Sequence, residues 1–114
     1  MSIAVDGGTY FIFNILNMGV IDLAGGDASA GARIQLYHQP FNCKVLSSMW
    51  QLKQVGDKWK IINAASNTAM QVKDGSSSNG TPVEGSPQYT TEKQLWKLDA
   101  FGGPSGEKVP RYYT

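Results

Sequence analysis

The strongest constraint on the fold is that the sequence repeats itself. Residues 10–14 align with residues 59–63 at an offset of 49, and both read aromatic, any residue, Ile, any residue, Asn. The same offset aligns five further pairs: Gly26 with Gly75, Ser29 with Ser78, Gly31 with Gly80, Ile34 with Val83, and Gln39 with Gln88. Residues 49–52 match residues 95–98 at an offset of 46, so one loop is three residues shorter in the second copy. One structural unit is therefore used twice.

Each copy predicts four short strands, and no segment shows sustained helical periodicity. The expected strands are residues 9–14, 20–23, 33–37 and 49–54, then 59–63, 69–72, 82–85 and 95–98. Glycine, Asp, Asn and Ser fill the links at 25–31 and 74–80, as tight turns require. In each first strand the aromatic residue and the Ile lie two apart and share one face. The expected core is Ile12, Ile61, Trp50, Trp96, Leu52 and Leu98.

Charge and hydropathy exclude several classes of function. The 114 residues carry a formal net charge of +1, with basic residues scattered along the chain, so a nucleic-acid partner is not expected. Apolar runs are far shorter than the roughly 20 residues of a membrane-spanning helix, so no membrane insertion is expected. Residues 1–6 lack the charged and apolar regions of a secretory signal, which predicts a cytoplasmic protein.

The sequence also lacks the residues of an enzyme or a metal site. Cys43 and His38 are single residues of their types, so they cannot form a structural zinc set or an intramolecular disulfide. No glycine-rich phosphate loop is present, because Gly25-Gly26 is not followed by Lys or a helix. We therefore expect no catalytic residues, no bound metal and no cofactor.

Several motifs resemble one known family. Gln94-Leu95-Trp96 is the Gln-x-Trp signature that closes each repeat of ricin-B-like (R-type) β-trefoil lectins, and residues 74–83 look like the turn and third strand of mushroom lectins in that family. Residues 8–12, 20–23 and 34–37 are similar to the first, second and third strands. The resemblance covers residues 7–99. It implies an all-β, β-trefoil-like domain over 1–114, with repeat one at 7–58, repeat two at 59–99 and a tail at 100–114.

The sequence departs from this family in two ways. A third repeat is missing after residue 99, although residues 111–114 could form its first strand. In the first copy Ser48 replaces the signature Gln, which in the family braces the sugar-binding acid. This loss predicts a looser site.

The resemblance implies a sugar site in the first repeat. Asp22 stands where the family keeps the acid that accepts hydrogen bonds from sugar hydroxyls, and Tyr37 where it keeps the aromatic that stacks on the sugar ring. The remaining candidates are a turn residue and three polar residues: Gly25, His38, Asn42 and Ser47. Without the resemblance, the leading interpretation of Asp22 is a solvated acid or a turn cap, and that of Tyr37 is a half-buried strand aromatic.

The second repeat is expected to bind sugar poorly. Gln71 and Ser86 stand at the positions of Asp22 and Tyr37, so the carboxylate and the aromatic are both missing there. Tyr89, three residues further on, is a possible substitute for the aromatic.

Three functions follow from these observations. The first is a non-catalytic lectin whose partners are glycans or glycoconjugates of the galactose or N-acetylgalactosamine type. The second is a β-trefoil protease inhibitor that acts through an exposed loop at 38–48 or 85–93. The third is a degenerate trefoil that binds neither and works by oligomerising. An incomplete trefoil also predicts a homo-oligomer, with a dimer formed through the open sheet edge and the tail 100–114. A monomer whose tail folds back is the alternative.

Overall fold

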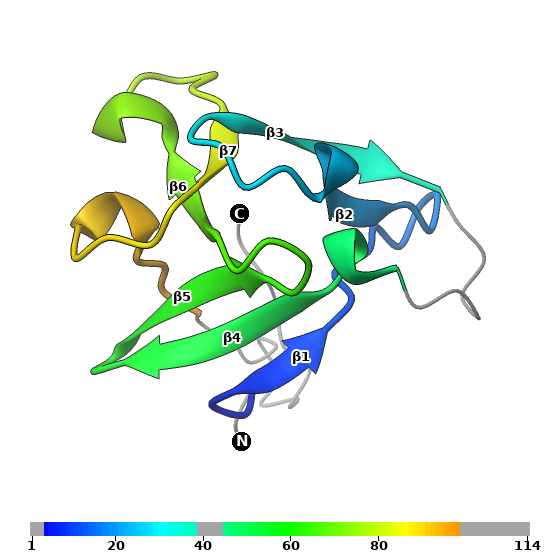
Figure 1. The fold of residues 1–114 in the computed structure, drawn as a ribbon, viewed down its shortest axis with the longest axis horizontal. Coiled ribbons are helices and arrows are strands. Elements are labelled where there is room, and N and C mark those ends of the chain that lie inside the picture. The colour runs from blue at the N-terminus through cyan, green and yellow to red at the C-terminus, as the bar shows by residue number, and fades with distance from the viewer. Residues whose placement is uncertain (1–3, 39–44, 99–114) are drawn as a thin grey trace, which may run out of the picture.

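The computed structural model describes residues 4–38 and 45–98, which form a curled sheet of seven antiparallel strands (Figure 1). The strands are β1 (Gly8–Tyr10), β2 (Val20–Leu23), β3 (Ala32–Tyr37), β4 (Trp50–Val55), β5 (Lys58–Asn63), β6 (Ala69–Val72) and β7 (Val83–Ser86). The 3₁₀ turns are η1 (Ala24–Gly26), η2 (Leu46–Ser48), η3 (Lys73–Gly75) and η4 (Glu92–Gln94). These ranges contain no α-helix, and the all-β prediction is confirmed.

The strands pair in the order β1-β4-β5-β6-β7-β3-β2. Beyond β1 the chain continues into Ile12 and Phe13, which pair with β2: the Ile21 N–H donates to the Ile12 carbonyl, and Phe13 bridges Val20. The first predicted strand, 9–14, is therefore interrupted after Tyr10, and its two halves connect the opposite ends of the strand order. This connection is what curls the sheet.

The two sequence repeats are also structural repeats. Tyr10 faces Trp50 across β1 and β4, and the equivalent Trp59 faces Trp96, with which it exchanges backbone hydrogen bonds of 2.8 and 2.9 Å. In the described part of the second copy, the strand predicted over 95–98 is reduced to this single bridge. The change of offset from 49 to 46 thus falls in the loop before the fourth element, as the sequence indicates.

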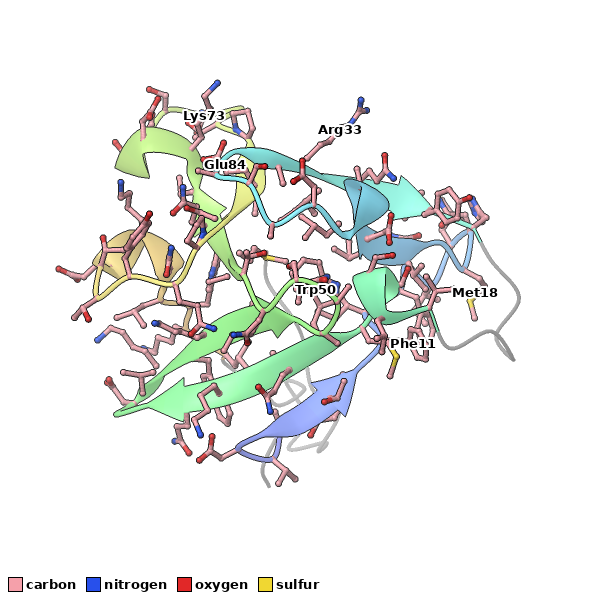
Figure 2. The ribbon with its side chains drawn as sticks, in the orientation of Figure 1. Phe11, Met18, Arg33, Trp50, Lys73 and Glu84 are labelled. Carbon is pink, nitrogen blue, oxygen red and sulfur yellow. The ribbon has the colours of Figure 1, made fainter. Side chains whose placement is uncertain are left out.

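The core prediction is confirmed for Trp50, Leu52 and Ile61, which are buried together. Figure 2 shows Trp50 pointing into the space enclosed by the sheet. The cluster also contains residues that the sequence pattern did not single out: Ala4, Leu23 and Ala32. Ile12, Trp96 and Leu98 are only partly buried and pack against this cluster. Ile12 lies in the interruption after β1, and Trp96 is joined to the sheet by a single bridge.

Two equivalent turns differ in the residue at their left-handed position. In both, an Asn side chain caps the turn: Asn14 Oδ1 accepts from the N–H groups of Leu16 and Asn17, and Asn63 Oδ1 from those of Ala65 and Ser66. Met18 and Asn67 then both adopt a φ of 60°. Asn tolerates this conformation far better than Met does. Met18 is therefore strained relative to its counterpart.

We expect Met18→Asn to raise the free energy of unfolding by about 0.5–1 kcal/mol, because it relieves the left-handed strain. The reciprocal Asn67→Met should lower the free energy of unfolding by at least as much. Gln88 Nε2 donates to both the backbone carbonyl oxygen and Oδ1 of Asn67, and the substitution removes the Oδ1 acceptor. Urea denaturation of both variants measures the two changes. A loss of stability in Met18→Asn would contradict the assignment of strain.

No helix within 4–38 or 45–98 is long and apolar enough to cross a membrane. The tail 100–114, Cys43 and Asn42 lie outside the described residues. The homo-oligomer prediction depends on that tail and stays a prediction.

Candidate functional site

A buried carboxylate lies at the centre of the candidate site. Asp22, on β2, is 5% exposed. Its Oδ1 accepts hydrogen bonds from Ser47 Oγ at 2.8 Å and Ser48 Oγ at 2.9 Å, and its Oδ2 accepts one from Gln35 Nε2 at 3.1 Å. A buried charge needs such partners, since an unsatisfied one would be costly. Asp22 is therefore neither a solvated acid nor a turn cap.

Two elements bring these donors to Asp22. Antiparallel pairing of β2 with β3 puts Gln35 directly opposite Asp22. The turn η2 supplies Ser47 and Ser48, and it is anchored from the second repeat by Asn63 Nδ2, which donates to the Ser47 carbonyl at 2.9 Å. The site of the first repeat is thus held in place by a residue of the second.

Ser48 forms a hydrogen bond to Asp22, although the replacement of Gln by Ser was expected to remove this support. It is fully buried, and its hydroxyl reaches Asp22 Oδ1 directly. A shorter side chain suffices because η2 lies close against β2, and Ser47 adds a second hydroxyl to the same oxygen. Asp22 therefore keeps a hydrogen-bond donor at this position, while the looser site stays a prediction.

Gln35 is a site residue that the sequence analysis missed. It lies two residues before Tyr37 on β3, so the two side chains point to the same face of the sheet. The alternation of the predicted strand places Gln35 and Tyr37 on one face. The sequence does not reveal the cross-strand register that puts Gln35 opposite Asp22.

The other predicted residues surround this cluster at the ends of β2 and β3. Tyr37 is 52% exposed at the end of β3. His38 is exposed, and its Nε2 lies 3.1 Å from the Asn17 carbonyl oxygen, to which it must donate. Gly25, in η1, has a φ of 64° and open space where a Cβ would lie. Asp22 and Ser47 are thus in contact and Tyr37 is open to solvent, whereas Asn42 lies outside the described residues.

The carboxylate has limited capacity for a further ligand. Two carboxylate oxygens offer about four acceptor positions, and three are occupied. The hydroxyl oxygen of Ser47 and the side-chain carbonyl oxygen of Gln35 add acceptors beside it. This arrangement can bind a hydroxyl group with an ionised acceptor while an exposed aromatic side chain stands on the same face of β3.

The second repeat contains the same cluster with its acid and amide exchanged between strands. Gln71, on β6, donates through Nε2 to Glu84 Oε2 at 2.8 Å, so Glu84 on β7 takes the place of Gln35. Gln94 is fully buried and donates through Nε2 to Gln71 Oε1 at 3.2 Å and to the Pro87 carbonyl at 2.8 Å. The position of Asp22 has no carboxylate in this copy, as the sequence indicates, but the register places the Glu84 carboxylate opposite Gln71.

The aromatic of the second repeat is missing, as expected. Ser86, at the position of Tyr37, is 2% exposed. Tyr89 is 56% exposed on the following loop, where its backbone N–H donates to Gln94 Oε1 at 2.9 Å. The residues described contain no group of three or more His, Cys, Asp or Glu side chains placed to hold a metal ion.

Residues 46–107 match the protein family described as "Ricin-type beta-trefoil lectin domain-like". The match covers more than half of the chain, and the chain belongs to this family. No curated protein matches the sequence.

Solved structures show the same fold at low sequence identity. The designed threefold-symmetric protein ThreeFoil gives a TM-score of 0.75 at 22% identity, over 82% of this chain and 66% of that protein. The Polyporus squamosus lectin, bound to the epitope Neu5Acα2-6Galβ1-4GlcNAc, gives 0.66 at 24% identity, over 83% of this chain and 34% of the lectin. An exo-β-1,3-galactanase from Clostridium thermocellum gives 0.72 at 20% identity, over 83% of this chain and 20% of the enzyme. The chain spans less than two thirds of the length of each of these three proteins. The structural similarity confirms the prediction of a β-trefoil fold.

Proposed function

We propose that the chain is a non-catalytic lectin whose first repeat binds a galactose- or N-acetylgalactosamine-type sugar. The observation that carries this proposal is the hydrogen-bonded Asp22 carboxylate with the exposed ring of Tyr37 at the end of the neighbouring strand. In this mode Asp22 accepts from one sugar hydroxyl, while Tyr37 stacks on the apolar face of the ring. Gly25, His38, Asn42 and Ser47 complete the proposed site.

Membership of a lectin-domain family supports carbohydrate binding. The structural neighbour bound to a sialylated galactose epitope supports a glycan ligand as well. The galactose preference is our proposal, and a glycan array with the full chain tests it. The protease-inhibitor alternative has no comparable support, and a trypsin and papain inhibition assay run beside the array separates the two functions.

We expect Tyr37→Ala to weaken galactoside binding roughly tenfold, because the stacking surface is lost. Isothermal titration calorimetry measures the change. The side chain of Tyr37 is half exposed, so the variant should keep its fold. Val5→Ala is the control, since that side chain is 67% exposed and lies before the first repeat. Equal losses in both variants would contradict a site at Tyr37.

A further inference from the structure

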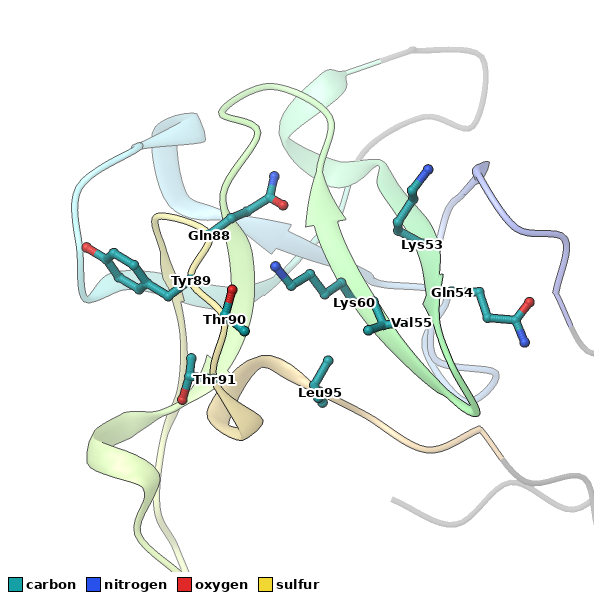
Figure 3. A pocket seen from close by; sticks show the side chains of 9 residues that line it. All are labelled: Lys53, Gln54, Val55, Lys60, Gln88, Tyr89, Thr90, Thr91 and Leu95. Carbon is teal, nitrogen blue, oxygen red and sulfur yellow. The ribbon is translucent and has the colours of Figure 1, made fainter.

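A hollow distinct from the Asp22 cluster lies between the β4–β5 hairpin and the loop 88–91 (Figure 3). Its volume is about 320 Å³. Lys53 and Lys60 line it from the two strands of the hairpin, while Tyr89 and Thr90 line it from the loop. Figure 3 shows the Lys60 side chain extending from β5 toward that loop. The hollow therefore has the Lys60 ammonium group on one side, its cationic wall, and the Thr90 hydroxyl on the other, its hydroxyl-bearing wall (Figure 3).

The cationic wall has an uncompensated charge. Lys53 and Lys60 are direct cross-strand partners, an arrangement in which like charges destabilise a sheet. Within 4–38 and 45–98 neither ammonium group forms an ion pair, and no Asp or Glu lines the hollow. The acid at the hairpin tip, Asp57, pairs with Lys58 instead, at 3.3 Å. The two side chains extend in different directions, Lys60 toward the loop 88–91 and Lys53 away from it (Figure 3), so a bound anion would compensate the charge of Lys60.

The remaining lining suits a ligand that has an apolar surface beside its charge. Val55 and Leu95 contribute apolar side chains, and the methylene stems of the two lysines add to them. The hydroxyl of Thr90 can donate to an oxyanion or accept from a hydroxyl group. A sugar ring with an acidic substituent combines all three features: a C–H face, hydroxyls and a negative charge.

We propose that this hollow binds an acidic saccharide, a sugar ring bearing a carboxylate or a sulfate group. The inference rests on the proposed lectin function only in taking the ligand to be a saccharide, and it assigns a second site with its own charge. A long polyanion such as a nucleic acid does not fit, because two lysines do not make an extended basic surface and the net charge is only +1. The volume is at the small end for ligand pockets, about 300–1,000 Å³, which suits a small ligand.

The test is an NMR titration of the isotopically labelled full chain with four probes: glucuronic acid, glucose 6-sulfate, glucose and inorganic sulfate. We expect the two acidic sugars to shift the amide signals of Lys60 and residues 88–91, and glucose to leave them unchanged. Lys60→Gln should weaken the acidic sugars about tenfold through loss of a charge-assisted hydrogen bond, and Lys53→Gln provides a second variant. Lys58→Gln is the control, because its ammonium group is paired with Asp57 and does not line the hollow.

Several results would overturn the proposal. Glucose binding as tightly as the acidic sugars would remove the role of the charge. Inorganic sulfate binding as tightly as glucose 6-sulfate would reduce the hollow to an anion site. An equal loss in Lys58→Gln would indicate general electrostatic attraction. The two sites are distinguished by a crossed comparison, in which Asp22→Asn keeps acidic-sugar binding and Lys60→Gln keeps galactoside binding. Loss of acidic-sugar binding in Asp22→Asn would refute a separate site.

Discussion

Replacing Asp22 with Asn is expected to abolish galactoside binding, with at least a hundredfold loss of affinity measured by calorimetry. The substitution removes the negative charge that strengthens the hydrogen bond from a sugar hydroxyl, a bond worth about 1.5–3 kcal/mol. It also introduces an amide N–H₂ group among side chains that now all donate to the carboxylate. A sugar hydroxyl would therefore meet a neutral and rearranged site.

Asp27→Asn is the matched control for this prediction. Asp27 lies in the turn after η1 and is exposed, and hydrogen bonds from Ser29 hold the pKa of its carboxyl below the usual value. Within the part of the chain that the structure describes, it forms no hydrogen bond with Asp22, Gln35, Ser47 or Ser48, so its replacement should leave binding unchanged. A far-ultraviolet circular dichroism spectrum checks that Asp22→Asn is folded. Retained galactoside affinity in a folded Asp22→Asn protein would refute the proposed site.

Trp50→Ala should have the largest effect on stability, a loss of about 3–5 kcal/mol in the free energy of unfolding. Trp50 is fully buried in the core cluster, and its Nε1 donates to the Ile21 carbonyl at 2.9 Å. Because small domains are stable by only about 5–15 kcal/mol, much of the margin would disappear. Urea denaturation followed by circular dichroism measures the change.

Trp96→Ala provides the internal comparison. Trp96 is its repeat counterpart and makes the equivalent bond, from Nε1 to the Met70 carbonyl at 3.0 Å, but it is only partly buried. Its loss should be clearly smaller. If Trp50→Ala leaves the protein unfolded, Trp50→Phe is the alternative variant. It keeps an aromatic ring in the core but removes the hydrogen bond to the Ile21 carbonyl, and the free energy of unfolding should fall by about 1–3 kcal/mol. A larger loss in Trp96→Ala than in Trp50→Ala would contradict this view of the core.

Sequence reasoning predicted the fold well where a repeated local pattern determines it. Two strands, 20–23 and 69–72, agree at both ends with β2 and β6. They are bounded by glycine-containing or polar turns whose conformation is encoded locally. The interruption after Tyr10 was not predicted, because the pattern of residues 9–14 is that of one continuous strand. The strand is interrupted because its first part pairs with β4 and its second part with β2.

The candidate site was predicted less completely for a related reason. Asp22 and Tyr37 belong to motifs that can be recognised in the sequence, whereas Gln35 and Glu84 become site residues only through cross-strand register. The role of Ser48 depends on how closely η2 packs against β2, and residue type alone does not contain that distance. Pairing and packing over long sequence separations therefore account for the differences.

The pairing of β3 with β7 has a consequence for how the chain folds. Ala32 pairs with Gly85, which lies 53 residues later (85 minus 32). Such non-local closure must be reached before its contacts contribute, and all-β domains of this kind fold in milliseconds to seconds. The β4–β5 hairpin, closed by the two residues Gly56 and Asp57, can form early because its partners are adjacent. During synthesis, β3 has no partner on its β7 edge until residue 85 has left the ribosome, so the first repeat matures only after the second is made.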